Sequence, residues 1–254
     1  MIRSVIAVIK LSLFACFTPP MMLMQILILK FNLGNKTWVP QFYNATVCRL
    51  IGIRISSHGH LPVTGLIVSN HISWKDILVL NAIIPLSLIA KREVGGWPMF
   101  GSLARLQGTI FVNRTNKRSM LASLEAMQAR LIKGDMLVLF AEGTTHTGKS
   151  VLSFKSSFFA AAERSNTPVI PVTLIYQTQH GLPLTLRQRP DVAWYGEGTL
   201  IPHLWAILKS GPLDVKVIIH PPRNLANRKL LASQSQRLIS AALAENLHAA
   251  PKMG

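Results

Sequence analysis

The hydrophobic positions of the 254-residue chain follow two patterns: a long apolar stretch near the N-terminus and, beyond residue 40, short apolar runs separated by amphipathic stretches. Short runs rich in β-branched residues favour buried strands, and their alternation with helical stretches is typical of an α/β fold. Strands are expected at residues 66–69, 86–90, 109–112, 136–140, 169–174, 192–194 and 215–220. The pattern predicts a single α/β domain with a central mixed sheet flanked by helices.

Two longer amphipathic stretches predict helices. Between residues 116 and 133, apolar side chains recur at helical spacing from Met120 to Leu131, and Gly134 follows as a C-terminal stop. This helix is expected to pack on the core. The second stretch, at about residues 227–248, is also amphipathic and contains no motif with assignable chemistry.

The apolar N-terminal stretch indicates a membrane anchor. Residues 11–29 include no charged side chain, but Pro19 and Pro20 stand in the middle, where proline removes backbone donors and breaks a helix. Two short helices are therefore expected, each too short to cross a hydrocarbon layer of about 30 Å. We predict a hairpin or kinked anchor over residues 1–36 that dips into one leaflet, followed by the α/β domain over residues 37–254. A cleaved signal peptide is the alternative, although no A-x-A cleavage site supports it.

Composition and charge agree with a membrane setting. Hydrophobic residues make up 49% of the chain and charged residues 15%, and the mean hydropathy is +0.34. Lys and Arg number 27 against 10 Asp and Glu, and a net charge of +17 attracts anionic lipids, nucleic acid or acidic carriers. Arg3, Lys30 and Lys36 predict that both ends of the anchor face the cytoplasm, at a bacterial inner membrane. Cys16 and Cys48 are too few for a disulfide framework.

A polar block directly follows the strand expected at 66–69 and reads Asn70, His71, Ile72, Ser73, Trp74, Lys75, Asp76. On one regular helix, His71 and Asp76 would lie about 140° apart and could not pair. If His71 lies in the turn and Asp76 in the first turn of the next helix, the carboxylate reaches one imidazole nitrogen. The other nitrogen is then free to act as a general base. A structural histidine is the alternative, because one such pair also arises by chance.

A second block follows the strand expected at 136–140. Gly143 permits close approach of the backbone, and Glu142, Thr144 and Thr145 offer hydrogen-bonding groups at the same end of the sheet. Taken alone, this block is equally consistent with a polar turn.

Arg114 ends the strand that is expected at 109–112. Its guanidinium is suited to binding phosphate through paired donors, although an exposed arginine at a strand end is common. His58 and His60 flank a glycine, but no cluster of His, Cys or carboxylates completes a metal site with them. No metal is therefore expected.

The three blocks, in this order, resemble the glycerolipid acyltransferase family, whose type members are the lysophosphatidic acid acyltransferases. The family has a His and an Asp separated by four residues, matched by His71 and Asp76. Its second motif ends in an arginine implicated in binding the acceptor phosphate, matched by Arg114, and its third is Glu-Gly-Thr, matched by residues 142–144. A fourth motif, an apolar segment around a proline, is matched by residues 169–172.

The resemblance, over about residues 65–175, implies that residues 37–254 form an O-acyltransferase domain. Such an enzyme moves an acyl group from an acyl carrier protein or coenzyme A thioester to a lysolipid hydroxyl in phospholipid biosynthesis, without a further cofactor. His71 is then the general base and Asp76 its support. Substrate binding is expected from Arg114, Glu142, Gly143, Thr144 and Thr145, and backbone amides at and near Gly143 are candidate donors to the oxyanion.

Lysophosphatidic acid is the expected acceptor, and lyso-ornithine lipid is the rival. Many family members follow Glu-Gly-Thr with an arginine where this chain has Thr145, and the later block 194–197 resembles enzymes that acylate lyso-ornithine lipid. A basic membrane-peripheral binding protein is the non-enzymatic alternative. It fits the charge but not the motifs, so the expected partners are the lysolipid, the thioester carrier and the membrane surface, without nucleic acid.

Overall fold

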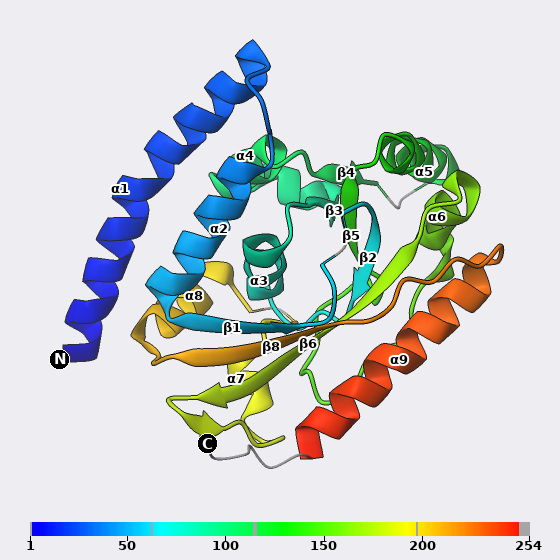
Figure 1. Cartoon of the computed structure of the whole chain (residues 1–254). Coiled ribbons are helices and arrows are strands. Elements are labelled where there is room, and N and C mark those ends of the chain that lie inside the picture. The colour runs from blue at the N-terminus through cyan, green and yellow to red at the C-terminus, as the bar shows by residue number, and fades with distance from the viewer. Residues whose placement is uncertain (1, 62, 114–115, 197, 249–254) are drawn as a thin grey trace.

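A mixed sheet with helices on both faces forms the centre of the molecule, and the computed structural model describes residues 2–61, 63–113, 116–196 and 198–248 (Figure 1). The strands are β1 (Ile53–His58), β2 (Gly65–Ser69), β3 (Ser87–Lys91), β4 (Ile110–Val112), β5 (Met136–Phe140), β6 (Val169–Gln179), β7 (Leu182–Pro183) and β8 (Leu213–Ile219). Their order is β1-β8-β6-β2-β5-β3-β4, with β7 paired to β6. Neighbours are parallel except that β6 runs antiparallel to β7 and β8, so the expected mixed sheet is confirmed.

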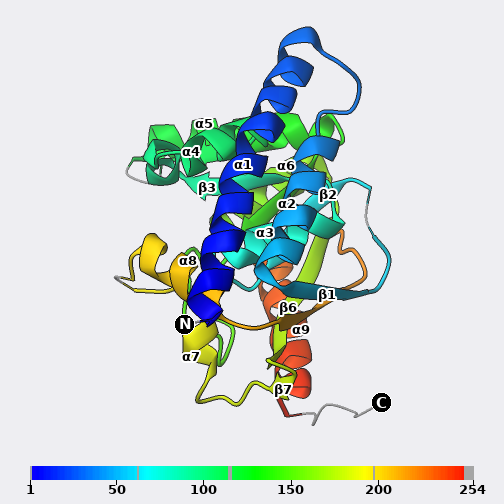
Figure 2. The same ribbon diagram turned by 90° about the vertical axis from the view of Figure 1, so that its left-hand side faces the viewer.

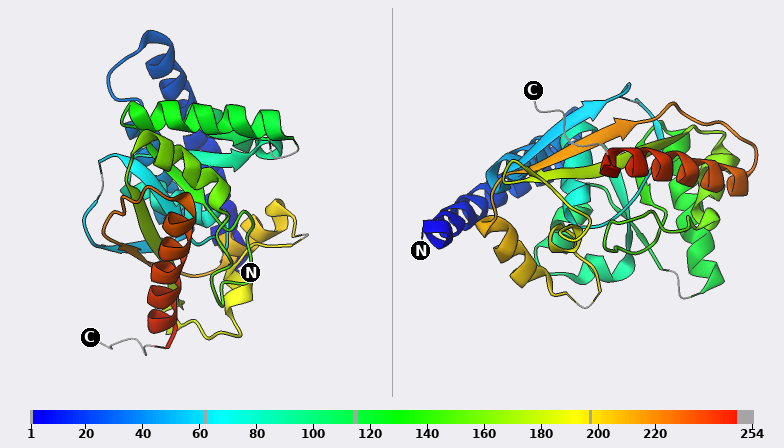
Figure 3. Two further views of the ribbon diagram at one scale, coloured as in Figure 1. Left: turned by 90° about the vertical axis from the view of Figure 1, so that its right-hand side faces the viewer. Right: turned by 90° about the horizontal axis from the view of Figure 1, so that it is seen from below.

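Helices cover both faces of the sheet, as Figures 2 and 3 show. They are α1 (Ile2–Phe31), α2 (Trp38–Ile51), α3 (Lys75–Ile83), α4 (Phe100–Leu106), α5 (Lys117–Ile132), α6 (Ala160–Ser165), α7 (Arg189–Val192), α8 (Leu200–Lys209) and α9 (Arg228–His248), with 3-10 turns η1 (Arg92–Gly96) and η2 (Ser156–Phe159). One core lies between the sheet and α2, α3, α7 and α8, and the other lies between the sheet and α5, α6 and α9.

The central strands explain why these two layers form. In β5, Val138 and Phe140 belong to the first core, and Leu137 and Leu139 to the second. A strand buried on both faces is a continuous apolar run, and the sequence of β5 is MLVLF. Six of the seven expected strands appear as β2, β3, β4, β5, β6 and β8, and the two expected long helices appear as α5 and α9.

The expected strand at residues 192–194 is wrong. Val192 ends the short helix α7, and the backbone that follows pairs with the turn after β2 instead of with a strand. Trp194 N donates to Ile72 O at 2.8 Å. A short apolar run predicts burial without distinguishing a strand from a buried loop, and here the partner is a loop.

The expected break of the N-terminal helix at Pro19 and Pro20 is also wrong, because α1 is one continuous helix of 30 residues. Contacts with α2 support the helix at this point: Thr18 Oγ1 is hydrogen-bonded to the Tyr43 hydroxyl at 3.0 Å, and Phe17 stacks on Tyr43 with ring centroids 5.7 Å apart. The hairpin therefore consists of α1 and α2, which run side by side in Figures 1 and 2, and not of two halves of α1.

Candidate active site

The turn that follows β2 is fixed to the neighbouring strand β6 by a side chain. Asn70 Nδ2 donates to Leu174 O at 2.9 Å, and Leu174 N donates to Asn70 Oδ1 at 2.9 Å. The side-chain amide of Asn70 thus takes the place of a backbone N–H and a backbone C=O. It holds the chain to β6 one residue beyond the end of β2. The position of His71 is therefore fixed relative to the sheet. It lies at the carboxyl end of parallel strands, where α/β folds place their ligand-binding sites.

His71 and Asp76 form a hydrogen-bonded pair, which confirms the predicted geometry of a strand-to-helix turn. Asp76 lies in the first turn of α3, and His71 Nδ1 is 2.9 Å from Asp76 Oδ2. The same oxygen accepts hydrogen bonds from Ile72 N at 2.7 Å and Ser73 N at 2.9 Å, and Oδ1 accepts one from the Tyr176 hydroxyl at 2.6 Å. With four donors around it, the buried carboxylate cannot rotate away from the imidazole.

The contact with Asp76 determines which imidazole nitrogen is available. Nδ1 is the donor to the carboxylate, so the lone pair of the neutral ring is on Nε2. The ring stacks on Phe140 with centroids 3.8 Å apart and an interplanar angle of 14°, and the side chain is 16% exposed. The imidazole is therefore held in one orientation while one edge stays accessible, as a general base requires.

The Glu142 side chain supports the turn that contains His71. Its Oε1 accepts a hydrogen bond from His71 N at 2.7 Å, and its Oε2 accepts one from Leu152 N at 2.7 Å and lies 2.7 Å from His146 Nε2. The side chain is fully buried, and Glu142 is not among the residues that line the cavity beside His71. The structure thus places Glu142 as a support of the His71 backbone, in contrast to the substrate contact expected for it.

Gly143, Thr144 and Thr145 line the cavity beside His71. Gly143 has φ +74°, which favours glycine, and its N–H donates to Phe140 O at 3.0 Å. The Gly143 amide is thus already engaged, so the structure does not support it as an oxyanion donor. Within the described ranges, the amides of Thr144 and Thr145 make no hydrogen bond and remain available.

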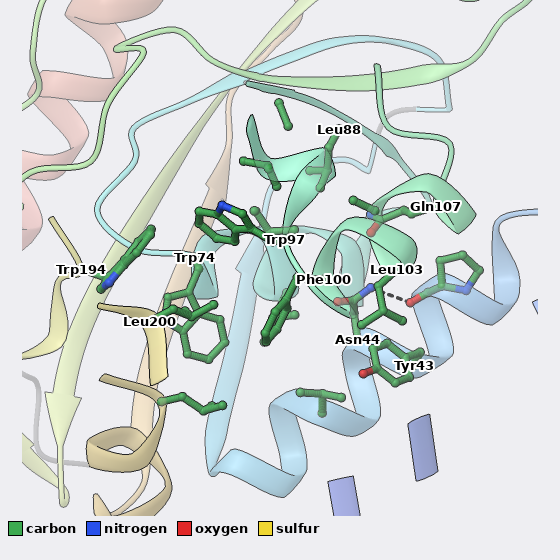
Figure 4. A pocket seen from close by; sticks show the side chains of 18 of the residues that line it. Tyr43, Asn44, Trp74, Leu88, Trp97, Phe100, Leu103, Gln107, Trp194 and Leu200 are labelled. Carbon is green, nitrogen blue, oxygen red and sulfur yellow. Dashed lines mark hydrogen bonds between the residues drawn. The ribbon is translucent and has the colours of Figure 1, made fainter. Parts of the chain in front are cut away.

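An apolar cavity of about 470 Å³ begins at His71 and lies between α1, α2, α3, α4 and α8. Figure 4 shows Trp74, Trp194 and Leu200 on one side of it and Tyr43, Asn44 and Gln107 on the other. Of the described lining residues, Lys91 alone carries a fixed charge. The size of the cavity is typical of sites for small organic ligands, and its apolar lining suits an aliphatic chain.

Arg114, the expected phosphate ligand, lies outside the described residues. No group of three or more His, Cys, Asp or Glu side chains that could hold a metal ion occurs in the part of the chain that the structure describes.

Three residues beside the pair were not assigned from sequence. Tyr176 comes from β6, 100 residues after Asp76, and no sequence signal links them. Lys75 lies inside the polar block itself, fully buried, and burial lowers its pKa to about 7 while the charge of Asp76 opposes that shift. His203 accepts a hydrogen bond from Trp74 Nε1 at 2.9 Å. Burial and the charge of Lys75 lower the pKa of His203 to about 4, although a hydrogen bond with the Ala193 backbone acts in the opposite direction.

Known proteins resemble this chain in sequence over much of its length. A family model described as Acyltransferase matches residues 53–175. A lyso-ornithine lipid O-acyltransferase from Brucella abortus is 41% identical over 231 residues, which cover 86% of each chain. Another protein of that name, from Rhizobium meliloti, is 40% identical over 208 residues, which cover 78% of this chain and 70% of its own. A 1-acyl-sn-glycerol-3-phosphate acyltransferase from Neisseria gonorrhoeae is 34% identical over 152 residues, which cover 60% of this chain and 57% of its own.

A solved structure shares the fold over nearly the whole length. The 1-acyl-sn-glycerophosphate acyltransferase from Thermotoga maritima matches with a TM-score of 0.70 and 18% identity, over 99% of this chain and 97% of its own. At that identity the likeness shows the fold, and the sequence relatives show the family. The resemblance expected from the motifs is confirmed: the chain belongs to the acyltransferase family.

Proposed function

We propose that this acyltransferase moves an acyl group from a thioester to the free hydroxyl of a lyso-ornithine lipid, with His71 as the general base. The proposal depends mainly on the position of the His71–Asp76 pair. His71 lines an apolar cavity, and its imidazole stays partly accessible there. A lysolipid offers a hydroxyl beside a long aliphatic chain, and this site suits both.

The reaction is direct transfer. His71 Nε2 takes the proton of the acceptor hydroxyl while the oxygen attacks the thioester carbonyl carbon, and a tetrahedral oxyanion forms. The C–S bond then breaks, the imidazolium returns the proton to the leaving sulfur, and the products are an ester and a free thiol. Asp76 stabilises the imidazolium and keeps Nδ1 protonated throughout.

Two backbone amides are the donors that we assign to the oxyanion. Thr144 and Thr145 line the cavity, and their N–H groups have no partner within the described ranges. Amides that are already oriented stabilise developing charge without reorganisation. Phe140 lies under the His71 ring, and Glu142 binds the backbone amides of His71 and Leu152, so the segment that supplies the donors also supports the base.

The choice of acceptor rests on the relatives and on one residue. The two relatives at 40 and 41% identity are named for lyso-ornithine lipid, whereas the Neisseria relative named for a phosphate acceptor is 34% identical over a shorter stretch. Thr145, which replaces an arginine common in the family, adds no positive charge to the cavity wall. A neutral side chain here favours a head group other than phosphate.

Lysophosphatidic acid, the acceptor first expected from the motifs, stays as the second candidate. Lys91 lines the cavity at the end of β3 and offers an ammonium group to a phosphate. The two acceptors are separated by incubating the purified protein in detergent micelles with an acyl thioester and each lysolipid in turn, and by measuring the diacylated products by mass spectrometry. Turnover at least ten-fold greater with lyso-ornithine lipid supports the proposal, and the reverse preference contradicts it.

The acyl donor belongs to the same proposal. Acyl carrier protein and coenzyme A both deliver the acyl group through a thioester on a phosphopantetheine arm, so the chemistry at His71 is the same with either. Running the assay with the same acyl group on each carrier measures the preference directly through kcat/KM.

Membrane docking through α1 completes the proposal. The helix is long and apolar enough to cross a bilayer by length and composition, but its buried residues Ala7, Thr18, Gln25 and Ile28 pack on the domain along about 32 Å of its axis. A crossing helix would draw the domain into the hydrocarbon, so we infer that α1 lies in one leaflet. Its outer face is apolar, with Leu13 53% and Leu23 58% exposed, and the catalytic domain then stays on the cytoplasmic face.

A further inference from the structure

Lys75 lies between His71 and Asp76 in the sequence, yet the proposed reaction gives its side chain no task. The residue begins α3 and has 0% relative exposure, which is rare for a lysine. Its Nζ donates to Val192 O at 2.8 Å and lies 5.2 Å from the centroid of the Tyr176 ring. A cation buried in an apolar core is costly unless specific contacts offset the loss of water.

The acceptor of this bond begins a segment that forms part of the cavity wall. Trp194, Tyr195 and Gly196 line the cavity, and Figure 4 shows Trp194 and Trp74 on the same side of it. Val192 is the last residue of a four-residue helix, so regular structure does little to hold the residues that follow. Residues 192–196 therefore depend on contacts with other parts of the chain.

Two hydrogen bonds connect the turn at His71 with residues 192–196, and a third connects it with α8. Trp194 N donates to Ile72 O at 2.8 Å, Trp74 Nε1 donates to His203 Nδ1 at 2.9 Å, and Lys75 Nζ donates to Val192 O. The Lys75 bond is fully buried, and it comes from the residue directly before Asp76. The position of the wall is thus coupled to the residue that orients the imidazole.

We propose that Lys75 is a positioning residue, whose side-chain nitrogen holds residues 192–196 against the His71–Asp76 turn and so sets the place of the reacting acyl group relative to His71. Without this donor the Val192 carbonyl is unpaired in the core, and the segment shifts toward another partner. A misplacement of about 1 Å can cost on the order of a hundred-fold in rate while the substrate still binds. The inference rests on the proposed acyl transfer.

The test compares Lys75→Met, which keeps the length and apolar stem of the side chain, with Lys216→Met as a matched control. Lys216 also donates a hydrogen bond through Nζ, to Asn246 Oδ1 at 2.9 Å, but it joins β8 to α9, away from the cavity. We expect Lys75→Met to lower kcat at least ten-fold with KM changed less than three-fold, and Lys216→Met to retain wild-type kcat. A kcat for Lys75→Met within two-fold of wild type overturns the proposal.

Hydrogen exchange supplies a readout that does not depend on turnover. The amide of Trp194 is expected to exchange at least ten-fold faster in Lys75→Met, while amides of α9 keep their wild-type rates; unchanged exchange at Trp194 overturns the proposal. If Lys75→Met does not fold, Lys75→Leu, whose side chain also lacks a donor, serves in both measurements with the same criteria. If the wild-type protein transfers no acyl group to either lysolipid, the proposed function is wrong. The exchange rate of the Trp194 amide still decides the role of Lys75 in that case.

Discussion

Tyr176 donates its hydroxyl hydrogen to Asp76 Oδ1 at 2.6 Å, from a strand 100 residues further along the chain. Burial and the negative charge of Asp76 raise the pKa of Tyr176 well above its usual value, so the phenol keeps its proton at neutral pH. The bond joins β6 to α3 and completes the set of donors around the carboxylate. The orientation of His71 thus depends on a residue that belongs to none of the sequence motifs.

Removing this hydroxyl is expected to impair catalysis without affecting substrate binding. In Tyr176→Phe, Asp76 keeps three donors and loses the fourth, and we expect kcat to fall about three- to ten-fold with KM unchanged. A hydrogen bond to a charged group contributes about 1.5–3 kcal/mol, so the free energy of unfolding is expected to fall by about that amount. Steady-state kinetics and urea unfolding measure the two effects, and wild-type values in both would show that the bond contributes nothing.

Glu142 is expected to be sensitive to replacement by its own amide. Both carboxylate oxygens accept hydrogen bonds from backbone N–H groups, Oε1 from His71 and Oε2 from Leu152. In Glu142→Gln one of these N–H groups faces an NH2 group, whichever way the amide turns, and a buried donor is left unpaired at a cost of about 1–3 kcal/mol. We predict a loss of at least ten-fold in kcat and a lower melting temperature.

Thr144→Val is the matched comparison for Glu142→Gln, since it alters a neighbouring side chain and keeps the backbone amide. Its kcat should stay within about three-fold of wild type. Equal losses in the two variants would argue against a specific support of His71 by Glu142.

The buried Lys75 predicts a pH dependence of stability. Its pKa is about 7 in the folded protein, against an ordinary value of 10.5, because burial disfavours the charged form; it faces Asp76, Tyr176 and His203. Between these two values the unfolded chain binds the proton more tightly, so the contribution of Lys75 to stability rises as the pH increases from about 7 to about 10. Below pH 7 the cost of burying the charge is at its full value.

Comparison with Lys75→Met isolates this contribution from that of other titrating groups. We expect the melting temperature of wild type, relative to the variant, to rise steadily from pH 7 to pH 10. A difference that is constant across this range would show that Lys75 has an ordinary pKa in the fold.

The apolar face of α1 is expected to bind the bilayer. In Leu13→Glu/Leu23→Glu, two exposed side chains of that face become charged, and we predict a loss of at least ten-fold in cofloatation with vesicles that contain anionic lipid. Leu121→Glu changes a leucine of similar exposure, 48%, on α5 in the other layer of the fold, and should float like wild type. Equal loss in both variants would contradict the assignment of α1 as the docking surface.

Sequence patterns predicted most of the sheet because its central strands are buried on both faces and are short apolar runs between turns. They failed at α1 and at residues 192–194, where the result depends on partners distant in sequence. Pro19 and Pro20 are tolerated because Phe17 and Thr18 pack on Tyr43 of α2. Val192 to Trp194 stay outside the sheet because the turn at Ile72 and Lys75 binds them.

The candidate site was predictable to the extent that its residues are close in sequence. The pairing of His71 with Asp76 follows from the local turn, and the two residues were identified from their spacing together with the order of the neighbouring motifs. Tyr176 reaches the pair only through the register of β6 beside β2, which no local pattern specifies. The interior position of Glu142 was missed for the same reason, because a motif identifies a residue without showing which way its side chain points.

Acyl transfer by the purified His71→Ala variant tests the central claim most directly. The variant removes the general base and leaves the cavity, Asp76 and the membrane face in place. With a fixed acyl thioester and lyso-ornithine lipid in micelles, and with lipid binding and melting temperature as controls, we predict that binding is retained and that kcat falls about a thousand-fold. A kcat within about three-fold of wild type, in a folded variant that binds lipid, would contradict the role of His71 as the catalytic base.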